Sequence, residues 1–380
     1  MATPAPEVRL LQELIAIPSV NPAFLPPGNP RAGERVVGEF VADTARRGGL
    51  SVSTQPVFEG RANILARLTP AGKVRHRVLL APHLDTVGFP DLDALLKPRL
   101  KNGRITGRGA CDTKGCVSAM LSAVLNVARS GKRPSSTEIV FVGLVDEENG
   151  QGGSRYYARH GDSADLAVVG EPTRLEVITA HKGDLWLQLK TRGRSAHGAT
   201  PHLGKNAVLE MARVVEVLET RYAEMLQERS HPLLGSPTVN VGAIRGGTQP
   251  NIVPNECVIS IDRRTLPGET EAGVKREIQT LLRSMGLTAE FDNLRLSECD
   301  ALETSPELPG VQALCRAAGR RRTRGVHYFC DAAPLAAGGI PSVVFGPGDI
   351  AQAHTADEWI AVESLQRGTA ILERFLRELE

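Results

Sequence analysis

The chain has 380 residues, 41% of them hydrophobic and 23% charged, a composition typical of a globular protein with roughly two or three domains. Its 45 Lys and Arg nearly balance its 43 Asp and Glu, and aromatic residues make up only 4%. This composition excludes a disordered chain and gives no reason to expect a nucleic-acid partner. No apolar run approaches the length needed to cross a bilayer, so we expect no membrane partner either.

The N-terminus and the cysteines predict a cytoplasmic protein. Residues 1–6 carry no positive charge, and no uninterrupted apolar stretch follows them, so they do not resemble a secretory signal. The six cysteines are scattered and form no CxxC pair, as expected for reduced thiols.

The first half of the chain alternates between predicted helices and strands. A short amphipathic helix opens the sequence, and a Pro- and Gly-rich surface loop at residues 21–30 leads to a second helix. Apolar runs then predict strands, and a helical period of apolar residues predicts a helix at residues 113–129. The predicted strands cover residues 78–82, 139–145 and 166–169. This alternation indicates an α/β fold with a mainly parallel sheet flanked by helices.

The middle of the chain has a different order of elements. Predicted strands and helices follow one another as β-α-β-β-α-β, at residues 184–191, 206–226, 238–244, 257–263, 271–285 and 287–291. This order is typical of a ferredoxin-like α+β domain. We therefore predict an inserted domain at residues 183–294, within an α/β domain formed by residues 1–182 and 295–380. That α/β domain resumes with a strand at residues 341–345 and closes with a helix at 364–379.

Acidic and histidine residues fall where the predicted strands end. His83, Glu148, Glu171 and His354 each follow a predicted strand, and Asp112 precedes the 113–129 helix. Ligands of open α/β sheets bind beyond the carboxyl ends of the strands, so these side chains are expected at one edge. Two imidazoles and three carboxylates suit zinc. Five candidate ligands exceed the needs of one zinc, and one bridging carboxylate would give each of two zincs three ligands.

Two further carboxylates have predicted supporting roles. Asp85 lies two residues beyond His83, where it can accept the second imidazole N–H and orient the ring. Glu147 and Glu148 are adjacent and point in different directions, so one can bind metal while the other faces substrate as a general base.

Five segments of this chain resemble a known family. It is the di-zinc metallopeptidase and amidase family that includes acetylornithine deacetylase, succinyl-diaminopimelate desuccinylase, carboxypeptidase G and aminoacylase. The matching segments, in order, are Pro82-His-Leu-Asp-Thr-Val87, Gly107-Arg-Gly-Ala-Cys-Asp-Thr-Lys-Gly115, Asp146-Glu-Glu148, Gly170-Glu-Pro-Thr173 and Ala353-His-Thr-Ala-Asp-Glu358.

The resemblance assigns roles to these residues and extends to the inserted domain. It implies His83 and Glu171 on one zinc, Glu148 and His354 on the other, and Asp112 bridging the two. It also implies a cis peptide bond between Asp112 and Thr113, and Glu147 as general base. In the inserted lid domain it implies His197 as the oxyanion donor, supplied by the partner subunit of a homodimer. Arg264 would bind the substrate carboxylate, with Arg263 as the alternative, and Asn251 would add a polar contact.

The sequence therefore predicts a zinc-dependent amidohydrolase with two zinc ions per subunit, for which cobalt or manganese are alternatives. A hydroxide bridging the zincs would attack the amide bond of an N-acyl amino acid, as in acetylornithine deacetylase or succinyl-diaminopimelate desuccinylase. The alternative within the class is a dipeptidase or a carboxypeptidase G-like enzyme. Outside enzymology, the alternative is a non-catalytic binding protein on the same fold, which predicts a damaged metal site. A nucleotide-dependent enzyme is disfavoured because the sequence has no phosphate-binding loop.

Overall fold

The computed structural model describes residues 4–89, 91–294 and 299–380, and the chain divides into two compact units. The larger unit contains the chain up to Thr179 together with Thr304–Arg324 and Cys330–Glu380, and the smaller unit contains Ala180–Glu303 and Gly325–Phe329. Among the described residues, no helix is both long enough and apolar enough to span a membrane.

A mixed sheet forms the centre of the larger unit. Its strands run in the order β1-β2-β6-β3-β7-β15-β8-β13, and β14 pairs with β8. The central strands β6, β3, β7 and β15 are parallel, and antiparallel strands flank them on both sides. The strands are β1 (Ser51–Phe58), β2 (Arg61–Leu68), β3 (His76–Pro82), β6 (Thr137–Gly143), β7 (Leu166–Gly170), β8 (Ile178–His181), β13 (Leu302–Glu303), β14 (Arg324–Val326) and β15 (Ser342–Val344). The predicted α/β class is confirmed.

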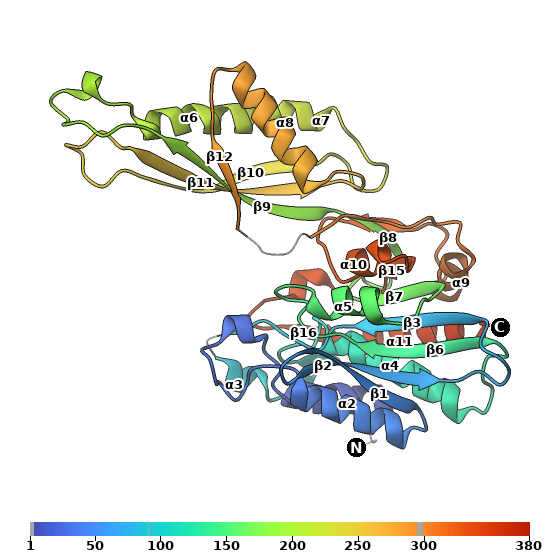
Figure 1. Cartoon of the computed structure of the whole chain (residues 1–380). Helices are drawn as coiled ribbons and strands as arrows, with labels where there is room; N and C mark the ends of the chain where they lie inside the picture. Colours follow the sequence, from blue (N-terminus) through green and yellow to red (C-terminus); the bar gives the residue numbers. More distant parts are fainter. Residues whose placement is uncertain (1–3, 90, 295–298) are drawn as a thin grey trace. The chain divides into compact units, whose positions relative to one another are not determined.

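Helices cover both faces of this sheet, as Figure 1 shows. Every residue of β6 and β7 is buried, because apolar side chains alternate between two covered faces. One face packs on the main core with α1 (Pro6–Ala16), α2 (Arg35–Arg47), α4 (Lys114–Arg129), α9 (Pro309–Ala318) and α11 (Val362–Arg377). The other carries α5 (Gly152–His160) and α10 (Ala332–Ala337). Among the described residues, the remaining larger-unit helices are α3 (Leu92–Leu95) and the 3-10 turns η1 (Pro22–Phe24) and η4 (Ile350–Gln352).

A small antiparallel sheet joins distant parts of the larger unit. Strand β16 (Trp359–Ala361) pairs with β5 (Arg104–Thr106), which pairs with β4 (Arg99–Lys101). In this register Trp359 lies opposite Thr106. The loop that follows β5 is therefore held beside the residue that precedes β16, and both loops reach the site described below.

The smaller unit has the predicted β-α-β-β-α-β order and a four-stranded antiparallel sheet, β10-β11-β9-β12. Its strands are β9 (Gly183–Arg192), β10 (Thr238–Gly246), β11 (Glu256–Thr265) and β12 (Glu290–Asn293). Its helices are α6 (Ala207–Val217), α7 (Ala223–Gln227) and α8 (Glu271–Ser284), with a π turn at Leu218–Tyr222 and a 3-10 turn at Pro201–Leu203. Helices α6 and α8 pack on one face of the sheet, as Figure 1 shows. No helix among the described residues of this unit covers the other face, which we call the open face.

Of two predicted elements of the smaller unit, one is confirmed and one needs correction. The helix predicted at residues 206–226 is present at residues 207–227, where α6 continues through the π turn into α7. The last strand was predicted at residues 287–291, but β12 begins at Glu290. Leu287 instead closes the end of α8, where its N–H donates to the carbonyl of Leu282 and its side chain enters the core. The apolar character of Leu287 reflects this packing.

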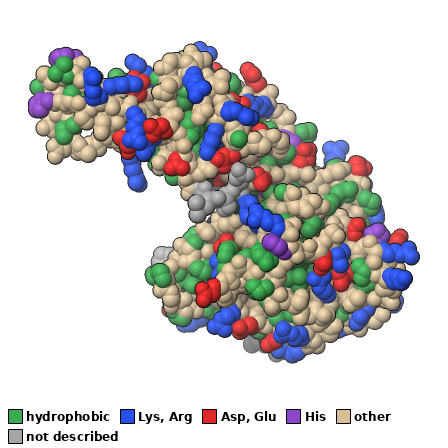
Figure 2. Space-filling model, viewed as in Figure 1, with side chains coloured by type: hydrophobic (Ala, Val, Ile, Leu, Met, Phe, Trp, Pro, Cys, Tyr) green, Lys and Arg blue, Asp and Glu red, His purple; other side chains and the backbone are tan. Residues whose placement is uncertain are grey.

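Charged side chains of both signs are interspersed over the face shown in Figure 2. The formal net charge of the whole chain is +2. The charges on this face are thus mixed, as expected from the composition.

Candidate active site

Asp112 occupies the centre of the site, between two histidines from distant parts of the chain. Its Oδ1 atom lies 3.1 Å from Nε2 of His83, which follows β3. Its Oδ2 atom lies 3.3 Å from Nε2 of His354, which follows the 3-10 turn Ile350–Gln352. The Asp112–Thr113 peptide bond is cis. One carboxylate therefore faces two imidazoles, one on each oxygen.

Three glutamates are divided between the two histidines. Oε2 of Glu148 lies 3.1 Å from Nε2 of His354. On the other side, Nε2 of His83 lies 3.8 Å from Oε1 of Glu171 and 4.0 Å from Oε2 of Glu147. The adjacent residues Glu147 and Glu148 thus face different histidines, because their side chains leave the backbone in different directions.

The glutamates share an environment that opposes negative charge. Burial raises the pKa of Glu148 to about 7, and the nearby Asp112 carboxylate adds to the shift. Burial also raises the pKa values of Glu147 and Glu171 well above the usual range, although the His83 charge partly offsets this. A buried carboxylate keeps its charge only beside a positive group, so these side chains favour a cation among them.

The histidines and Asp112 shift in the directions that this charge distribution predicts. Hydrogen bonds to Asp112 and then Glu148 raise the pKa of His354 to about 10. Burial alone would lower the pKa of His83, but its hydrogen bonds to carboxylates outweigh burial and raise it. For Asp112 the balance is reversed: burial would raise its pKa, but hydrogen bonds with the two histidines lower it. All three pKa shifts reflect the close contact between carboxylates and imidazoles at this site.

These residues fit a pair of divalent metal ions. The ligand atoms of His83, Asp112 and Glu148 all lie within 4.8 Å of one another. Among the described residues, no hydrogen-bond partner reaches the buried Oε1 atoms of Glu148 and Glu171. Buried polar atoms without a partner are costly, and a cation would satisfy both oxygens. Imidazole nitrogens and carboxylate oxygens are the donors that zinc takes in hydrolytic sites.

Asp85 organises the loops that carry the ligands. Its carboxylate accepts the backbone N–H of Glu147 and that of Glu148, each at 3.1 Å. It also accepts Nδ2 of Asn21 at 2.8 Å. Nδ1 of His83 lies 3.0 Å from the Asp85 carbonyl oxygen and 3.3 Å from its Oδ1. Asp85 therefore fixes both glutamates and the imidazole at once.

The loop at residues 21–30 was predicted to lie on the surface, and its first residue corrects that prediction. Asn21 is fully buried, and its Nδ2 also donates to Oδ1 of Asp146 at 3.0 Å. The same Asp146 oxygen accepts Arg61 at 3.1 Å, and Arg61 forms a two-bond pair with Glu34. Asn21, Arg61 and Glu34 were not predicted as site residues from the sequence. Together they hold the Asp146–Glu148 segment in place.

Asp331 is a further buried acid that the sequence did not single out. Its Oδ1 accepts a hydrogen bond from Oγ of Ser154 at 2.5 Å. Burial raises the pKa of Asp331 to about 7, and its charge in turn raises the pKa values of Glu147 and Glu171. Asp331 therefore belongs to the electrostatic surroundings of the site, although no short sequence pattern marks it.

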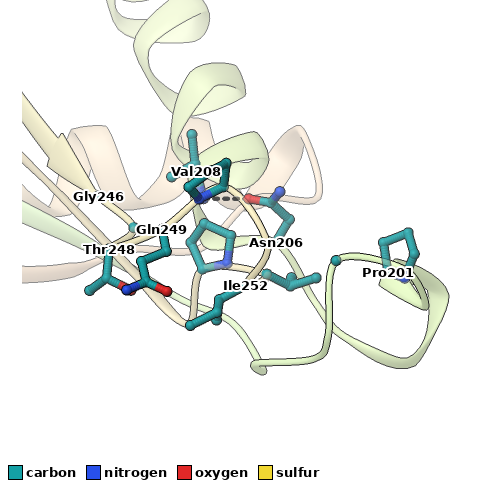
Figure 3. A pocket seen from close by; sticks show the side chains of 12 residues that line it. Pro201, Asn206, Val208, Gly246, Thr248, Gln249 and Ile252 are labelled. Carbon is teal, nitrogen blue, oxygen red and sulfur yellow. Dashed lines mark hydrogen bonds between the residues drawn. The ribbon is translucent and has the colours of Figure 1, made fainter.

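His197 and Asn251 lie on neighbouring segments of the smaller unit. The N–H of Gly198 donates to the Asn251 carbonyl at 2.7 Å, and His197 forms an isolated bridge with Ile252. Both predicted residues are exposed. Beside them is a cavity of about 520 Å³, which Figure 3 shows, lined by Gly198, Pro201, Asn206, Val208, Gly246, Gly247, Thr248, Gln249, Pro250, Ile252, Val253 and Pro254.

The two candidate arginines of β11 have opposite environments. Arg263 is fully buried, where Nε donates to the Tyr222 hydroxyl at 3.1 Å and Nη2 to Glu269 at 2.6 Å. Arg264 is on the open face of the sheet, where Nε and Nη2 contact the two carboxylate oxygens of Asp262 at 2.9 and 3.0 Å. Only Arg264 is accessible to a ligand on that face.

Comparisons with known proteins match this fold and site. The model of "Peptidase family M20/M25/M40" matches residues 79–378. Acetylornithine deacetylase of Myxococcus xanthus is 33% identical over 322 residues, covering 83% of each chain. Acetylornithine deacetylase of Vibrio cholerae is 30% identical over 359 residues, covering 91% of each chain.

Solved structures share the fold across the chain. An aminopeptidase of Bacillus cereus superposes with a TM-score of 0.78 at 22% identity, covering 98% of both chains. A Bacillus subtilis protein described as a dinuclear metal-binding peptidase has a TM-score of 0.69 at 12% identity, covering 98% of this chain and 96% of that one. The matched segment contains His83, Asp112, Glu148, Glu171 and His354, and the chain belongs to peptidase family M20/M25/M40.

Proposed function

We propose that this chain is a zinc-dependent deacylase of N-acyl amino acids, with acetylornithine or a related N-acyl diamino acid as substrate. The observation that carries the proposal is Asp112, which lies between His83 and His354 with a glutamate beside each imidazole. The relatives named acetylornithine deacetylase support the substrate class. The runner-up is a dipeptidase or carboxypeptidase, which the peptidase names of the structural neighbours favour.

The ligand assignment follows the division of carboxylates between the histidines. His83 and Glu171 would hold one ion, Glu148 and His354 the other, and Asp112 would bridge them. Zinc suits these donors best, with cobalt and manganese as alternatives. A pair of such ions, when bound, lowers the pKa of water and polarises an amide carbonyl.

Glu147 is positioned to move the proton. Its carboxylate lies on the His83 side of the site, 4.0 Å from Nε2, and burial raises its pKa. A raised pKa suits a group that must take a proton from water and then give it to the leaving amine nitrogen. We assign Glu147 both steps, while Asp85 fixes its backbone through the 3.1 Å hydrogen bond.

The lid side chains would recognise the substrate. Arg264 is assigned to the carboxylate of the amino acid, because its planar guanidinium binds such groups with two hydrogen bonds. Its contact with Asp262 already shows this two-bond geometry. His197 is assigned to the oxyanion, and Asn251 to a further polar contact from the neighbouring loop.

The positions of Arg264 and His197 within the lid support a homodimer. Arg264 pairs with Asp184 at the start of β9, whereas His197 lies beyond Arg192 at its end. The strand between them spans about 25 Å, so one small substrate cannot touch both side chains of the same lid. A second subunit would supply His197. The edge strand β10 and the exposed Leu209 of α6 offer a surface for such pairing.

Mixing two inactive variants tests this arrangement. Glu147→Gln and His197→Ala subunits, refolded or exchanged together in equal amounts, should regain about a quarter of wild-type activity. Random pairing makes half of the dimers mixed, and each mixed dimer has one complete site. Each variant alone is the control. If the mixture stays inactive although native mass spectrometry shows that it contains mixed dimers, His197 does not act across the interface.

Hydrolysis of a substrate panel tests the function itself. Zinc-loaded enzyme would be assayed with N-acetylornithine, other N-acetyl and N-succinyl amino acids, and dipeptides. We expect the highest kcat/KM for an N-acyl diamino acid, and an increased KM for Arg264→Lys, which loses the two-bond contact. Turnover of dipeptides alone would favour the peptidase alternative. Protein that binds no zinc and hydrolyses nothing would favour a non-catalytic binding protein, whereas zinc binding without turnover would mean that the panel lacks the substrate.

The six free, buried cysteines support a cytoplasmic location.

A further inference from the structure

Two charged residues in the matching motifs have no role in the mechanism described so far. Arg108 precedes Asp112 in the chain, and Glu358 follows His354. Their side chains are 1% and 0% exposed and form a salt bridge at 2.8 Å between Nη1 and Oε2. A buried pair of this kind is weak evidence for stability, because desolvation of two charges offsets their attraction. Its geometry indicates a different purpose.

The Glu358 carboxylate binds the backbone that carries Asp112. Its Oε1 atom accepts the N–H of Cys111 at 2.8 Å and the N–H of Asp112 at 2.9 Å. Its Oε2 atom accepts the N–H of Gly109 at 2.9 Å, in addition to Arg108. One carboxylate therefore accepts four hydrogen bonds from a single loop, and one of them comes from the candidate bridging ligand itself.

The same pair also binds the loop that carries His354. Nη2 of Arg108 donates to the carbonyl of Thr355, next to His354, at 3.1 Å. The backbone N–H of Gly107 donates to the carbonyl of Glu358 at 3.0 Å. Pairing of β16 with β5 continues this connection beyond Glu358. The Asp112 and His354 loops, far apart in the sequence, are thus tied together through Arg108 and Glu358.

We propose that Glu358, with Arg108, is a positioning residue that sets the spacing of Asp112 and His354 and thereby the affinity for the metal pair. The backbone amide of Asp112 determines where its carboxylate starts, so a fixed amide fixes both oxygens. Partners that orient metal ligands in this way affect metal affinity by about 10–100-fold when they are changed. This inference rests on the proposed metal-dependent function.

Glu358→Gln is the most informative variant. The amide keeps the size of the side chain, but its nitrogen cannot accept a hydrogen bond. Whichever way the amide turns, two of the four donors lose their acceptor. The matched control is Glu138→Gln, which changes another buried carboxylate that binds arginine: Glu138 accepts Nε of Arg77 at 2.6 Å. Glu138 lies near the start of β6, at the opposite end of the sheet from the site.

The measurement is a calorimetric zinc titration of chelator-treated protein, with thermal unfolding alongside. We expect Glu358→Gln to weaken binding of at least one zinc by about 10–100-fold, and Glu138→Gln to keep wild-type zinc affinity. If both variants lower Tm and Glu358→Gln nevertheless binds both zincs with wild-type affinity, the proposal is wrong.

A second variant keeps the test open if Glu358→Gln does not fold. Arg108→Lys retains the charge but loses the planar fork that reaches both Glu358 and Thr355, and we expect roughly tenfold weaker zinc binding. Unchanged affinity in this variant would also contradict the proposal. Wild-type protein that binds two zincs but hydrolyses none of the N-acyl amino acids would contradict the proposed substrate class, while the titration would still decide the role of Glu358.

Discussion

Glu147→Gln is expected to lower kcat by about 10²–10⁴-fold while both metal ions stay bound. Glutamine keeps the size of the side chain but cannot take a proton from water. The carboxylate of Glu147 lies beside the candidate ligands, 4.0 Å from Nε2 of His83, whereas its neighbour Glu148 contacts His354. Steady-state kinetics and metal content of the purified variant, measured together, check this prediction.

The neighbouring residue provides the matched control for that variant. Glu148→Gln has the same chemical change one position away, but Glu148 contacts His354 and has a buried oxygen without a hydrogen-bond partner among the described residues. We expect it to lose metal as well as activity. If Glu147→Gln lost metal while Glu148→Gln retained it, the roles of the two glutamates would have to be exchanged.

Asp112→Ala is expected to remove both metal ions and to lower activity by roughly a thousandfold or more, since catalysis here needs the metal pair. Its two oxygens face different histidines, and among the described residues no other carboxylate contacts both of them. The change also leaves His83 and His354 without their shared carboxylate. Zinc content by atomic emission and calorimetric titration are the measurements.

His354→Ala separates a bridging role from an ordinary ligand role. It removes one imidazole from one half of the site, so we expect weaker binding of one ion and near-normal binding of the other. An Asp112→Ala protein that still bound two ions at wild-type affinity would show that Asp112 does not bridge. Circular dichroism of both variants would confirm that the fold is intact.

The sequence was sufficient to predict that the candidate ligands lie close together, because parallel strands place their carboxyl ends at one edge. His83 follows β3 directly, and Glu171 follows β7 directly, so their neighbourhood follows from strand order alone. The order of elements in the smaller unit was equally predictable, since its alternating and helical periods are regular. Element ends were less certain: β6 ends at Gly143, before the predicted end at residue 145.

Residues that act through long-range hydrogen bonds could not be predicted in this way. Asn21 precedes a proline and caps the turn at Pro22–Phe24, which is its only local signal, and its bonds to Asp85 and Asp146 depend on tertiary structure. Glu358 belongs to a matching motif, but its four donors come from a loop far away in the sequence.

The choice between Arg263 and Arg264, which the sequence analysis left open, could have been made from the alternation of apolar residues along β11. Cys257, Ile259 and Ile261 occupy every second position of β11, so the next residue on the buried face is Arg263. Arg264 must then project from the open face. The two arginines look alike in composition, but strand periodicity distinguishes them, and the structure shows them on opposite faces.

The larger unit is discontinuous in sequence, and this affects the order in which its parts are synthesised on the ribosome. Four of the candidate ligands precede the smaller unit in the chain, but His354 and Glu358 follow it. The loop of Asp112 cannot meet His354 and Glu358 until almost the whole chain has been synthesised. The complete arrangement of candidate ligands can therefore form only late in synthesis, as the last part of the larger unit folds onto the first.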